Sequence, residues 1–291
     1  MRLLSNDGLY AADIFIQNDG PIVFAFDNMN SAGPIENRVG WGFDFIRSKD
    51  INVISFLETR STAWYRRTSF FHFLDEIDRA FNFNQFSSRI SYGGSMGGYA
   101  AGAFASRLNC DSAILLNPIS TLNKQLAPWE PRYPKAKKEN WESSFHDASE
   151  GIIGVSKVFL VADPLLAPDR KHIHRFFQAS PRCEFYRIPG VGHGMPRHMH
   201  SLGVLKPFVL DILKGNIPDK VAFSAAVRNR RDYLGYYQGI FSNESLHRTP
   251  MRTKTLSKNL AKVLNSDQVP KPQAKKMFAR MTGKNPSRFG L

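Results

Sequence analysis

A glycine-rich turn between a strand pattern and a helix pattern constrains this chain more than any other feature of its sequence. Residues 91–101 read SYGGSMGGYAA, follow a short β-type run and lead into an alanine-rich helical pattern over residues 98–108. The spacing Gly93-x-Ser95-x-Gly97 puts a serine on a turn so tight that its hydroxyl projects into open space. The N-terminus of the following helix directs amide hydrogens at any oxyanion formed there. We therefore expect Ser95 to be a nucleophile if an acid and a histidine follow it in the right order; a purely structural turn is the alternative.

Buried strand patterns alternate with amphipathic helix patterns from the N-terminus to about residue 215. The predicted strands cover residues 9–17, 21–26, 51–57, 89–92, 112–116, 155–161 and 184–188. One predicted helix ends near residue 48, and the others cover residues 69–81, 98–108, 168–179 and 199–213. Asn18-Asp19-Gly20, between the first two strands, is a strong signal for a β-hairpin turn. The alternation predicts an α/β fold with a mostly parallel, doubly wound sheet.

Two segments depart from this alternation. Residues 117–151 contain four prolines together with Trp129, Tyr133 and Trp141, and we expect them to form a cap or lid insertion that is partly packed. Residues 216–291 hold 15 Lys or Arg against 4 Asp or Glu, whereas the first 215 residues hold 24 against 21. The charge therefore predicts an α/β domain over residues 1–215 and a basic, mainly helical C-terminal extension over residues 216–291.

The extension carries a net charge of +11 and contains two short amphipathic stretches, near residues 256–264 and 273–281. A charge of this size fits an anionic partner such as a membrane surface or an acidic polysaccharide. A solvated extension without a partner is the alternative. Nucleic acid is the weakest of the candidate partners, because no recognised nucleic-acid-binding module is present.

Cysteine content and hydropathy bear on the compartment. Cys110 and Cys183 are the only cysteines, too few for a disulfide framework or a zinc cluster, and a reducing cytoplasm is the expected location. No apolar run approaches the roughly 20 residues of a membrane span, and the first residues lack the apolar region of a secretory signal. The expected chemistry requires neither a metal nor an organic cofactor.

A serine hydroxyl becomes a strong nucleophile when a histidine takes its proton and a carboxylate orients that histidine. His193 lies in the glycine-rich segment PGVGHGM, residues 189–195, directly after the last predicted strand. Asp163 ends the preceding strand, at the edge of the sheet where active sites of parallel sheets form. Asp169 is the alternative acid. However, it lies at the start of a predicted helix, where an acidic side chain interacts favourably with the helix dipole or caps the helix. We therefore expect Asp163 and His193 to complete a triad with Ser95.

The oxyanion formed at the serine needs two backbone donors. We expect one to be the N–H of Met96, directly after the nucleophile, and the other to come from the loop after the strand at residues 21–26, at Asn28 or Met29. His198 and His200 also lie close to the histidine loop in the sequence. Because they fall at the start of a predicted helix, we expect them to face solvent or to support the site.

The segment YGGSMGGYAA, residues 92–101, resembles the elbow of the α/β-hydrolase superfamily, and the resemblance covers roughly residues 8–215. More narrowly, it is similar to a bacterial branch whose elbow reads Tyr-Gly-x-Ser-Met-Gly-Gly-Tyr-Ala-Ala. In that branch a Trp-Tyr pair follows the preceding strand, as Trp64 and Tyr65 do here. Members of the branch are mostly uncharacterised, and some resemble hydrolases that act around surface polysaccharides.

The resemblance implies an α/β-hydrolase fold in which Ser95 is the nucleophile, Asp163 the acid and His193 the base, the chain order of that superfamily. The sequence departs from well-studied esterases in the loop at residues 27–30, which would supply the second oxyanion donor. The basic extension lies outside the resemblance.

Together these features predict a serine hydrolase that cleaves a carboxylic ester, on a small molecule or an acylated glycan, through an acyl-enzyme. Trp64 and Tyr65, with the insertion at residues 117–151, are expected to shape the substrate pocket. Thioesterases and peptidases use the same catalytic residues, so the sequence leaves these two activities as alternatives. The second interpretation is a binding or assembly module with an inactive triad that works through its basic extension. Such a module keeps its function in Ser95→Ala and loses it on truncation after about residue 215.

Overall fold

The chain folds into two compact units in the computed structural model, which describes residues 1–266 and 269–291. The first unit comprises Met1–Ala162 and Ala167–Tyr186, and the second comprises Asp163–Leu166 and Arg187–Leu291. The boundary expected near residue 216 falls inside the second unit, between the helices α7 (Leu205–Leu213) and α8 (Lys220–Val227). A separate domain beginning at residue 216 stays a prediction.

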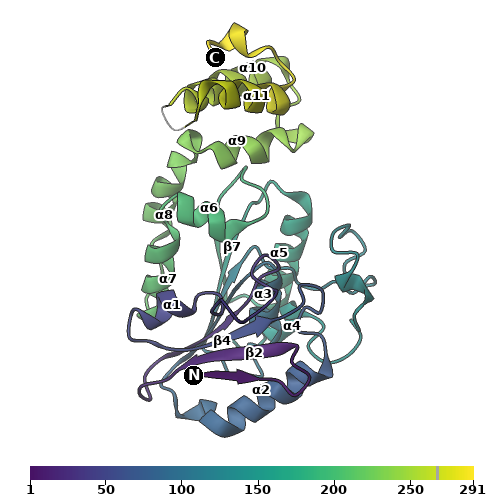
Figure 1. The fold of residues 1–291 in the computed structure, drawn as a ribbon, viewed down its shortest axis with the longest axis vertical. Helices are drawn as coiled ribbons and strands as arrows, with labels where there is room; N and C mark the ends of the chain where they lie inside the picture. Colours follow the sequence, from purple (N-terminus) through teal and green to yellow (C-terminus); the bar gives the residue numbers. More distant parts are fainter. Residues whose placement is uncertain (267–268) are drawn as a thin grey trace. The chain divides into compact units, whose positions relative to one another are not determined.

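An eight-stranded sheet runs through the first unit (Figure 1). Its strands are β1 (Arg2–Leu4), β2 (Tyr10–Phe15), β3 (Ile22–Phe26), β4 (Asn52–Glu58), β5 (Arg89–Gly94), β6 (Ser112–Leu116), β7 (Lys157–Ala162) and β8 (Cys183–Arg187). Their order across the sheet is β1-β2-β4-β3-β5-β6-β7-β8. The pairs β1–β2 and β2–β4 are antiparallel, and β4–β3, β3–β5, β5–β6 and β6–β7 are parallel. The prediction of a mostly parallel sheet is confirmed.

Helices flank the strands along the chain. Those of the first unit are α1 (Phe43–Arg47), α2 (Thr68–Phe81), α3 (Met96–Ala103), α4 (Ala148–Gly151) and α5 (Ala167–Ala179). Those of the second unit are α6 (Met195–Ser201), α7, α8, α9 (Leu234–Phe241), α10 (Pro250–Leu264) and α11 (Lys271–Thr282). No helix in the described part of the chain combines the length and apolarity that crossing a bilayer requires.

The core of the first unit explains why its strands are continuous apolar runs. Successive residues of a strand point to opposite faces of the sheet. On β3, Phe24 and Phe26 join one large hydrophobic cluster with Phe70 of α2, while Val23 and Ala25 are also fully buried. A strand that is buried on both faces has no polar alternation, which is the pattern that the sequence shows.

Part of the segment at residues 117–151 packs against the rest of the first unit, to which it belongs; its role as a cap or lid stays a prediction. Trp141 is buried, with its ring 5.0 Å from that of Tyr99 and 6.1 Å from that of Trp64. The buried guanidinium of Arg66 donates to three backbone carbonyls of the insertion, those of Asn140, Ser143 and Ser144. The buried charge of Arg66 and the tilted ring contacts of Trp141 therefore hold this part of the insertion in place.

Three predictions of local structure were wrong. Residues 18–20 do not close a hairpin, because β4 lies between β2 and β3; the Asn52 side chain of β4 instead binds the turn, accepting the N–H of Gln17 at 2.9 Å. The helix predicted over residues 199–213 is two helices, α6 and α7, since Gly203 adopts a left-handed φ of 71° between them. The elbow helix is also shorter than predicted, since α3 ends at Ala103.

The last helices of the second unit have a small core of their own. Tyr237 of α9, Leu260 and Leu264 of α10 and Phe278 of α11 form one hydrophobic cluster, and Figure 1 shows α9 beside these two helices. The two amphipathic stretches expected in the extension fall within α10 and α11. The last three helices therefore fold around a shared apolar cluster, whereas Ile217, Val221 and Met251 of the extension are exposed.

Candidate active site

Ser95 lies on the turn between β5 and α3, where the glycine spacing predicted it. Its backbone has φ 55° and ψ −113°, values that glycine favours and that strain a residue with a side chain. From Ile90 to Ala105 every residue is buried except Ser95, which is half-buried. Ser95 is therefore the one residue of this segment that is partly accessible.

The glycines of the elbow allow β5, α3 and β3 to approach closely. A Cβ on Gly93 would overlap the carbonyl of Gly97, and a Cβ on Gly97 would overlap the carbonyl of Phe26. Gly98 is less crowded, because its Cβ would lie 3.1 Å from the Cα of Pro118. The end of β3 is therefore held against the first turn of α3.

The expected oxyanion donors lie on these two adjoining segments. Met96 is the first residue of α3 and is fully buried. Asn28 follows β3, and its Oδ1 accepts the N–H groups of Asn30 at 2.9 Å and Ser31 at 3.2 Å, which folds the loop into a tight turn. Asp27, the first residue of this loop, is fully buried, and its carboxylate accepts the N–H groups of Trp41 at 3.1 Å and Glu58 at 3.2 Å. Which backbone N–H groups would face an oxyanion stays a prediction.

Trp64 and Tyr65 are fully buried and both have positive φ values, 52° and 55°. The carboxylate of Glu58 supports this strained turn by accepting the N–H groups of Ala63, Trp64 and Tyr65 at 2.9–3.1 Å. Burial raises the pKa of Glu58 to about 8, although the three donors oppose the shift. Both aromatic side chains are thus packed inside the structure, and their expected contact with a substrate stays a prediction.

Asp163 and His193 belong to the second unit, where the carboxylate of Asp163 contacts the loop that carries His193. Its Oδ2 accepts the N–H of Gly192 at 2.7 Å. Asp163 is 2% exposed, whereas His193 is half-buried. Gly190, Gly192 and Gly194 have φ values of 85°, 77° and 102°, so the loop bends at positions that favour glycine, as expected.

His198 supports this loop from α6. Its Nε2 lies 3.4 Å from the backbone oxygen of His193, and its Nδ1 hydrogen-bonds with the hydroxyl of Tyr233 at 3.1 Å. Burial, with a smaller contribution from Arg197, lowers the pKa of His198 to about 4, so the ring is neutral at physiological pH. Of the two roles that the sequence left open, the structure shows a supporting one.

Helix α9 also packs against the histidine loop. A Cβ on Gly239 would overlap the carbonyl of Gly190, and a Cβ on Gly190 would lie 2.7 Å from the ring of Tyr236. The extension therefore contributes Gly239 and Tyr236, with Tyr233, to the surroundings of His193. No motif in the sequence identified these residues.

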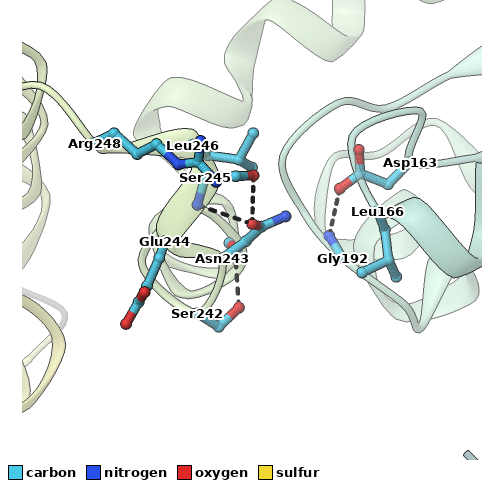
Figure 2. A pocket seen from close by; sticks show the side chains of 10 residues that line it. Asp163, Leu166, Gly192, Ser242, Asn243, Glu244, Ser245, Leu246 and Arg248 are labelled. Atoms are coloured by element: carbon cyan, nitrogen blue, oxygen red, sulfur yellow. Dashed lines mark hydrogen bonds between the residues drawn. The ribbon is translucent and has the colours of Figure 1, made fainter. Parts of the chain in front are cut away.

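A pocket of about 370 Å³ lies beside the contact between Asp163 and Gly192 (Figure 2). Its other lining residues are Leu166, Gly239, Ser242, Asn243, Glu244, Ser245, Leu246 and Arg248. The Asn243 side chain accepts the N–H and the hydroxyl of Ser245, at 3.2 and 2.7 Å. Residues of the extension thus form the wall opposite the candidate acid.

The alternative acid, Asp169, has a different partner in the first unit. It lies in the first turn of α5, is fully buried and pairs with Arg132 at 2.8 Å. Arg132 comes from the insertion, so this ion pair ties the insertion to α5. Asp163 is the better candidate acid, because it contacts the loop of His193.

Tyr133 was expected to pack or, as part of the insertion, to shape the substrate pocket, but a contact with the nucleophile was not predicted; its hydroxyl hydrogen-bonds with Ser95. A sequence contains no signal for such a contact, because the two residues belong to separate segments.

Within residues 1–266 and 269–291, no group of three or more His, Cys, Asp or Glu side chains is placed to hold a metal ion.

No protein-family model matches the chain, and no curated protein sequence matches it. Among solved structures, it is similar to a Staphylococcus aureus protein of unknown function, with a TM-score of 0.51 and 12% identity over 74% of this chain and 98% of that one. It is also similar to the Pyrococcus furiosus esterase Pf2001, with a TM-score of 0.50 and 14% identity over 75% and 92% of the two chains. The fluorophosphonate-binding serine hydrolase F of S. aureus has a TM-score of 0.46 and 13% identity over 78% and 97%.

Likenesses at this level of identity bear on the fold alone. The mostly parallel eight-stranded sheet with flanking helices is the α/β-hydrolase fold. The fold that the elbow implied is therefore confirmed.

Proposed function

We propose that this chain is a serine hydrolase that cleaves a carboxylic ester, on a small molecule or an acylated glycan, through an acyl-enzyme. The conformation of Ser95 carries the proposal: a strained, half-buried serine at a helix N-terminus, in an elbow that is otherwise buried. Backbone strain that a glycine would relieve is typical of functional sites. The similarity of fold to an esterase agrees with this chemistry.

In the proposed reaction, Ser95 Oγ attacks the ester carbonyl while His193 takes the hydroxyl proton. The N–H of Met96 and an N–H of the Asn28 loop stabilise the oxyanion. His193 then gives its proton to the leaving alcohol, and the acyl group stays on the serine. A water molecule then attacks the acyl carbon and transfers a proton to His193. The bond between this carbon and Ser95 Oγ breaks, His193 returns the proton to Oγ, and the acid is released. Asp163 orients the imidazole and stabilises its charged form.

An ester is favoured over an amide because an alkoxide leaves with less assistance than an amine does. The partial positive charge at the N-terminus of α3 adds to oxyanion stabilisation. Thioesters react through the same steps.

Labelling with a fluorophosphonate probe tests the proposal. Wild type is expected to label, Ser95→Ala to fail, and Asp163→Ala to label far more slowly than wild type. Asp169→Ala is the matched carboxylate control and is expected to label at a higher rate than Asp163→Ala. A folded wild type that does not label would contradict the proposal.

Cys110 and Cys183 are free and buried. This agrees with our proposal of a reducing compartment, the cytoplasm, since paired cysteines are typical of oxidising compartments.

The basic helices carry a second candidate function, the binding of an anionic partner such as a membrane surface or an acidic polysaccharide. Residues 249–291 contain ten Lys or Arg and one Asp or Glu, and neither α10 nor α11 contains an acidic residue. Lys254, Lys258 and Lys262 are exposed at intervals of four residues, and like charges at this spacing destabilise a helix by about 0.2–0.5 kcal/mol per pair.

Such an unbalanced charge costs stability unless an anion neutralises it. Binding to heparin and to vesicles of anionic lipid, compared between wild type and a Lys254→Glu/Lys258→Glu/Lys262→Glu variant, tests this function. Equal retention of both proteins at low salt would argue against it.

A further inference from the structure

The residue that contacts the candidate nucleophile from the insertion is Tyr133. It lies 38 positions beyond Ser95 in the sequence, and its hydroxyl hydrogen-bonds with that of Ser95. Both residues are half-buried. A phenol hydroxyl therefore stands beside the oxygen at which the proposed reaction begins.

The backbone of Tyr133 is held in an unfavourable conformation. Its φ is 62°, in the left-handed region that an aromatic residue rarely adopts. Such a conformation persists only where the surroundings determine it, and it is concentrated at functional sites.

The ring of Tyr133 is held between two partners. The Trp64 ring lies 4.8 Å from it, centroid to centroid, and the guanidinium carbon of Arg132 lies 5.3 Å from its centroid. Trp64 is itself fully buried. The ring therefore has little freedom to turn the hydroxyl away from Ser95.

Arg132 is anchored by two buried carboxylates. Its guanidinium pairs with Glu130 at 2.6 Å and with Asp169 at 2.8 Å. Burial opposes the charge of Glu130, but the hydrogen bonds from Arg132 and His172 outweigh it and lower the pKa of this carboxyl. Because buried carboxylates in this state need a cation, Arg132 is fixed in place.

A second buried contact holds Glu130. His172 Nε2 lies 2.9 Å from its carboxylate, and His172 Nδ1 lies 2.9 Å from the hydroxyl of Ser120. These three side chains resemble a catalytic triad in composition, but all are buried to 2% exposure or less. They form the support on which Arg132 and Tyr133 rest.

The Tyr133 hydroxyl is a hydrogen-bond donor at neutral pH. Burial raises its pKa above that of a free tyrosine, although Arg132 and the contact with Ser95 act in the opposite direction. A protonated phenol can donate to a developing negative charge.

We propose that the hydroxyl of Tyr133 donates a hydrogen bond to the oxyanion that forms when Ser95 attacks an ester, acting as a side-chain member of the oxyanion hole. This inference rests on the proposed hydrolase function. When the serine oxygen bonds to the carbonyl carbon and the carbonyl oxygen becomes negative, the Tyr133 hydroxyl donates its hydrogen bond to that oxygen. The loop at residues 27–30, which departs from those of known esterases, then need not supply the hole alone.

Tyr133→Phe is the direct test, because it removes the hydroxyl and keeps the ring between Trp64 and Arg132. The loss of one oxyanion donor typically lowers kcat roughly 100- to 1,000-fold. We expect that loss for p-nitrophenyl acetate, with KM nearly unchanged and with slower fluorophosphonate labelling that still maps to Ser95. Tyr10→Phe is the matched control, since Tyr10 is fully buried and its hydroxyl has no hydrogen-bond partner in the described structure.

The outcomes separate this inference from the proposed function. A wild type that neither labels nor hydrolyses esters overturns both. If wild type labels but the kcat of Tyr133→Phe is less than about fivefold lower than that of wild type, the role of Tyr133 is overturned and the proposed hydrolase function stands. A Tyr133→Phe variant with lower KM and higher kcat would identify the tyrosine as an obstruction and would also overturn it.

Discussion

Replacing Ser95 with glycine is expected to stabilise the first unit relative to replacing it with alanine. At φ 55° and ψ −113°, a residue with a Cβ is strained by about 1–3 kcal/mol, and alanine keeps that strain. Glycine relieves it but costs about 0.5–1 kcal/mol in chain flexibility. Both variants lose the hydrogen bond with Tyr133 equally, so the difference between them isolates the backbone. The two ranges together give a difference of about 0–2.5 kcal/mol in free energy of unfolding, and we expect Ser95→Gly to be more stable than Ser95→Ala by about 1 kcal/mol, near the middle of that range.

Tryptophan fluorescence during guanidinium denaturation measures this difference. All four tryptophans, at positions 41, 64, 129 and 141, lie in the first unit, so the signal follows the unit that contains Ser95. The thermal midpoint should rise by roughly 2–4 °C per kcal/mol. A Ser95→Gly protein that is no more stable than Ser95→Ala would refute the assignment of strain to this turn. Neither variant is expected to label with a fluorophosphonate.

Three further predictions concern other positions. Gly93→Ala should destabilise the protein by about 3 kcal/mol or more because its Cβ overlaps a carbonyl, whereas Gly98→Ala should change stability by about 1 kcal/mol or less; equal effects in thermal unfolding would contradict the close approach at the elbow. Glu58 keeps its proton in the native state up to about pH 8, whereas the unfolded side chain loses it near pH 4.5. The free energy of unfolding should therefore fall as pH rises through that interval, and Glu58→Gln should remove this dependence. Denaturation curves at pH 5 and pH 9 measure it, and an equal change with pH in wild type and Glu58→Gln would contradict the prediction. Gly239→Ala should push α9 away from Gly190 and slow labelling at Ser95 at least about tenfold while circular dichroism stays unchanged; an unchanged labelling rate would show that α9 does not position the loop.

The elbow and the strands could be predicted because local sequence determines them. Gly93-x-Ser95-x-Gly97 excludes most alternatives to a tight strand–turn–helix connection, and the structure has that turn. The buried strands are short apolar runs bounded by polar residues, and Ser112–Leu116 was predicted with the observed bounds. Such features depend on residues close together in the chain.

Features that depend on distant residues could not be predicted in this way. The turn at residues 18–20 has the composition of a hairpin, but the pairing of β4 with both β2 and β3 is decided by the whole sheet. The contact between Tyr133 and Ser95 depends on how Arg132 is anchored by Asp169, 37 residues further on. The aromatic pair Trp64 and Tyr65 has the same composition whether it packs or binds a ligand, and the sequence does not separate the two roles.

Helix α9 contacts two features of the second unit that were described separately, the basic helices and the glycine-rich histidine loop. It contacts Gly190 through Gly239 and shares a hydrophobic cluster with α10 and α11. If a polyanion repositions α9 and thereby changes the affinity for substrate by some factor, substrate must change the affinity for the polyanion by the same factor, because the two binding equilibria are linked. Helix α9 thus contacts both the basic helices and the histidine loop, so an anion bound to the proposed site on α10 and α11 would act on the loop through this helix.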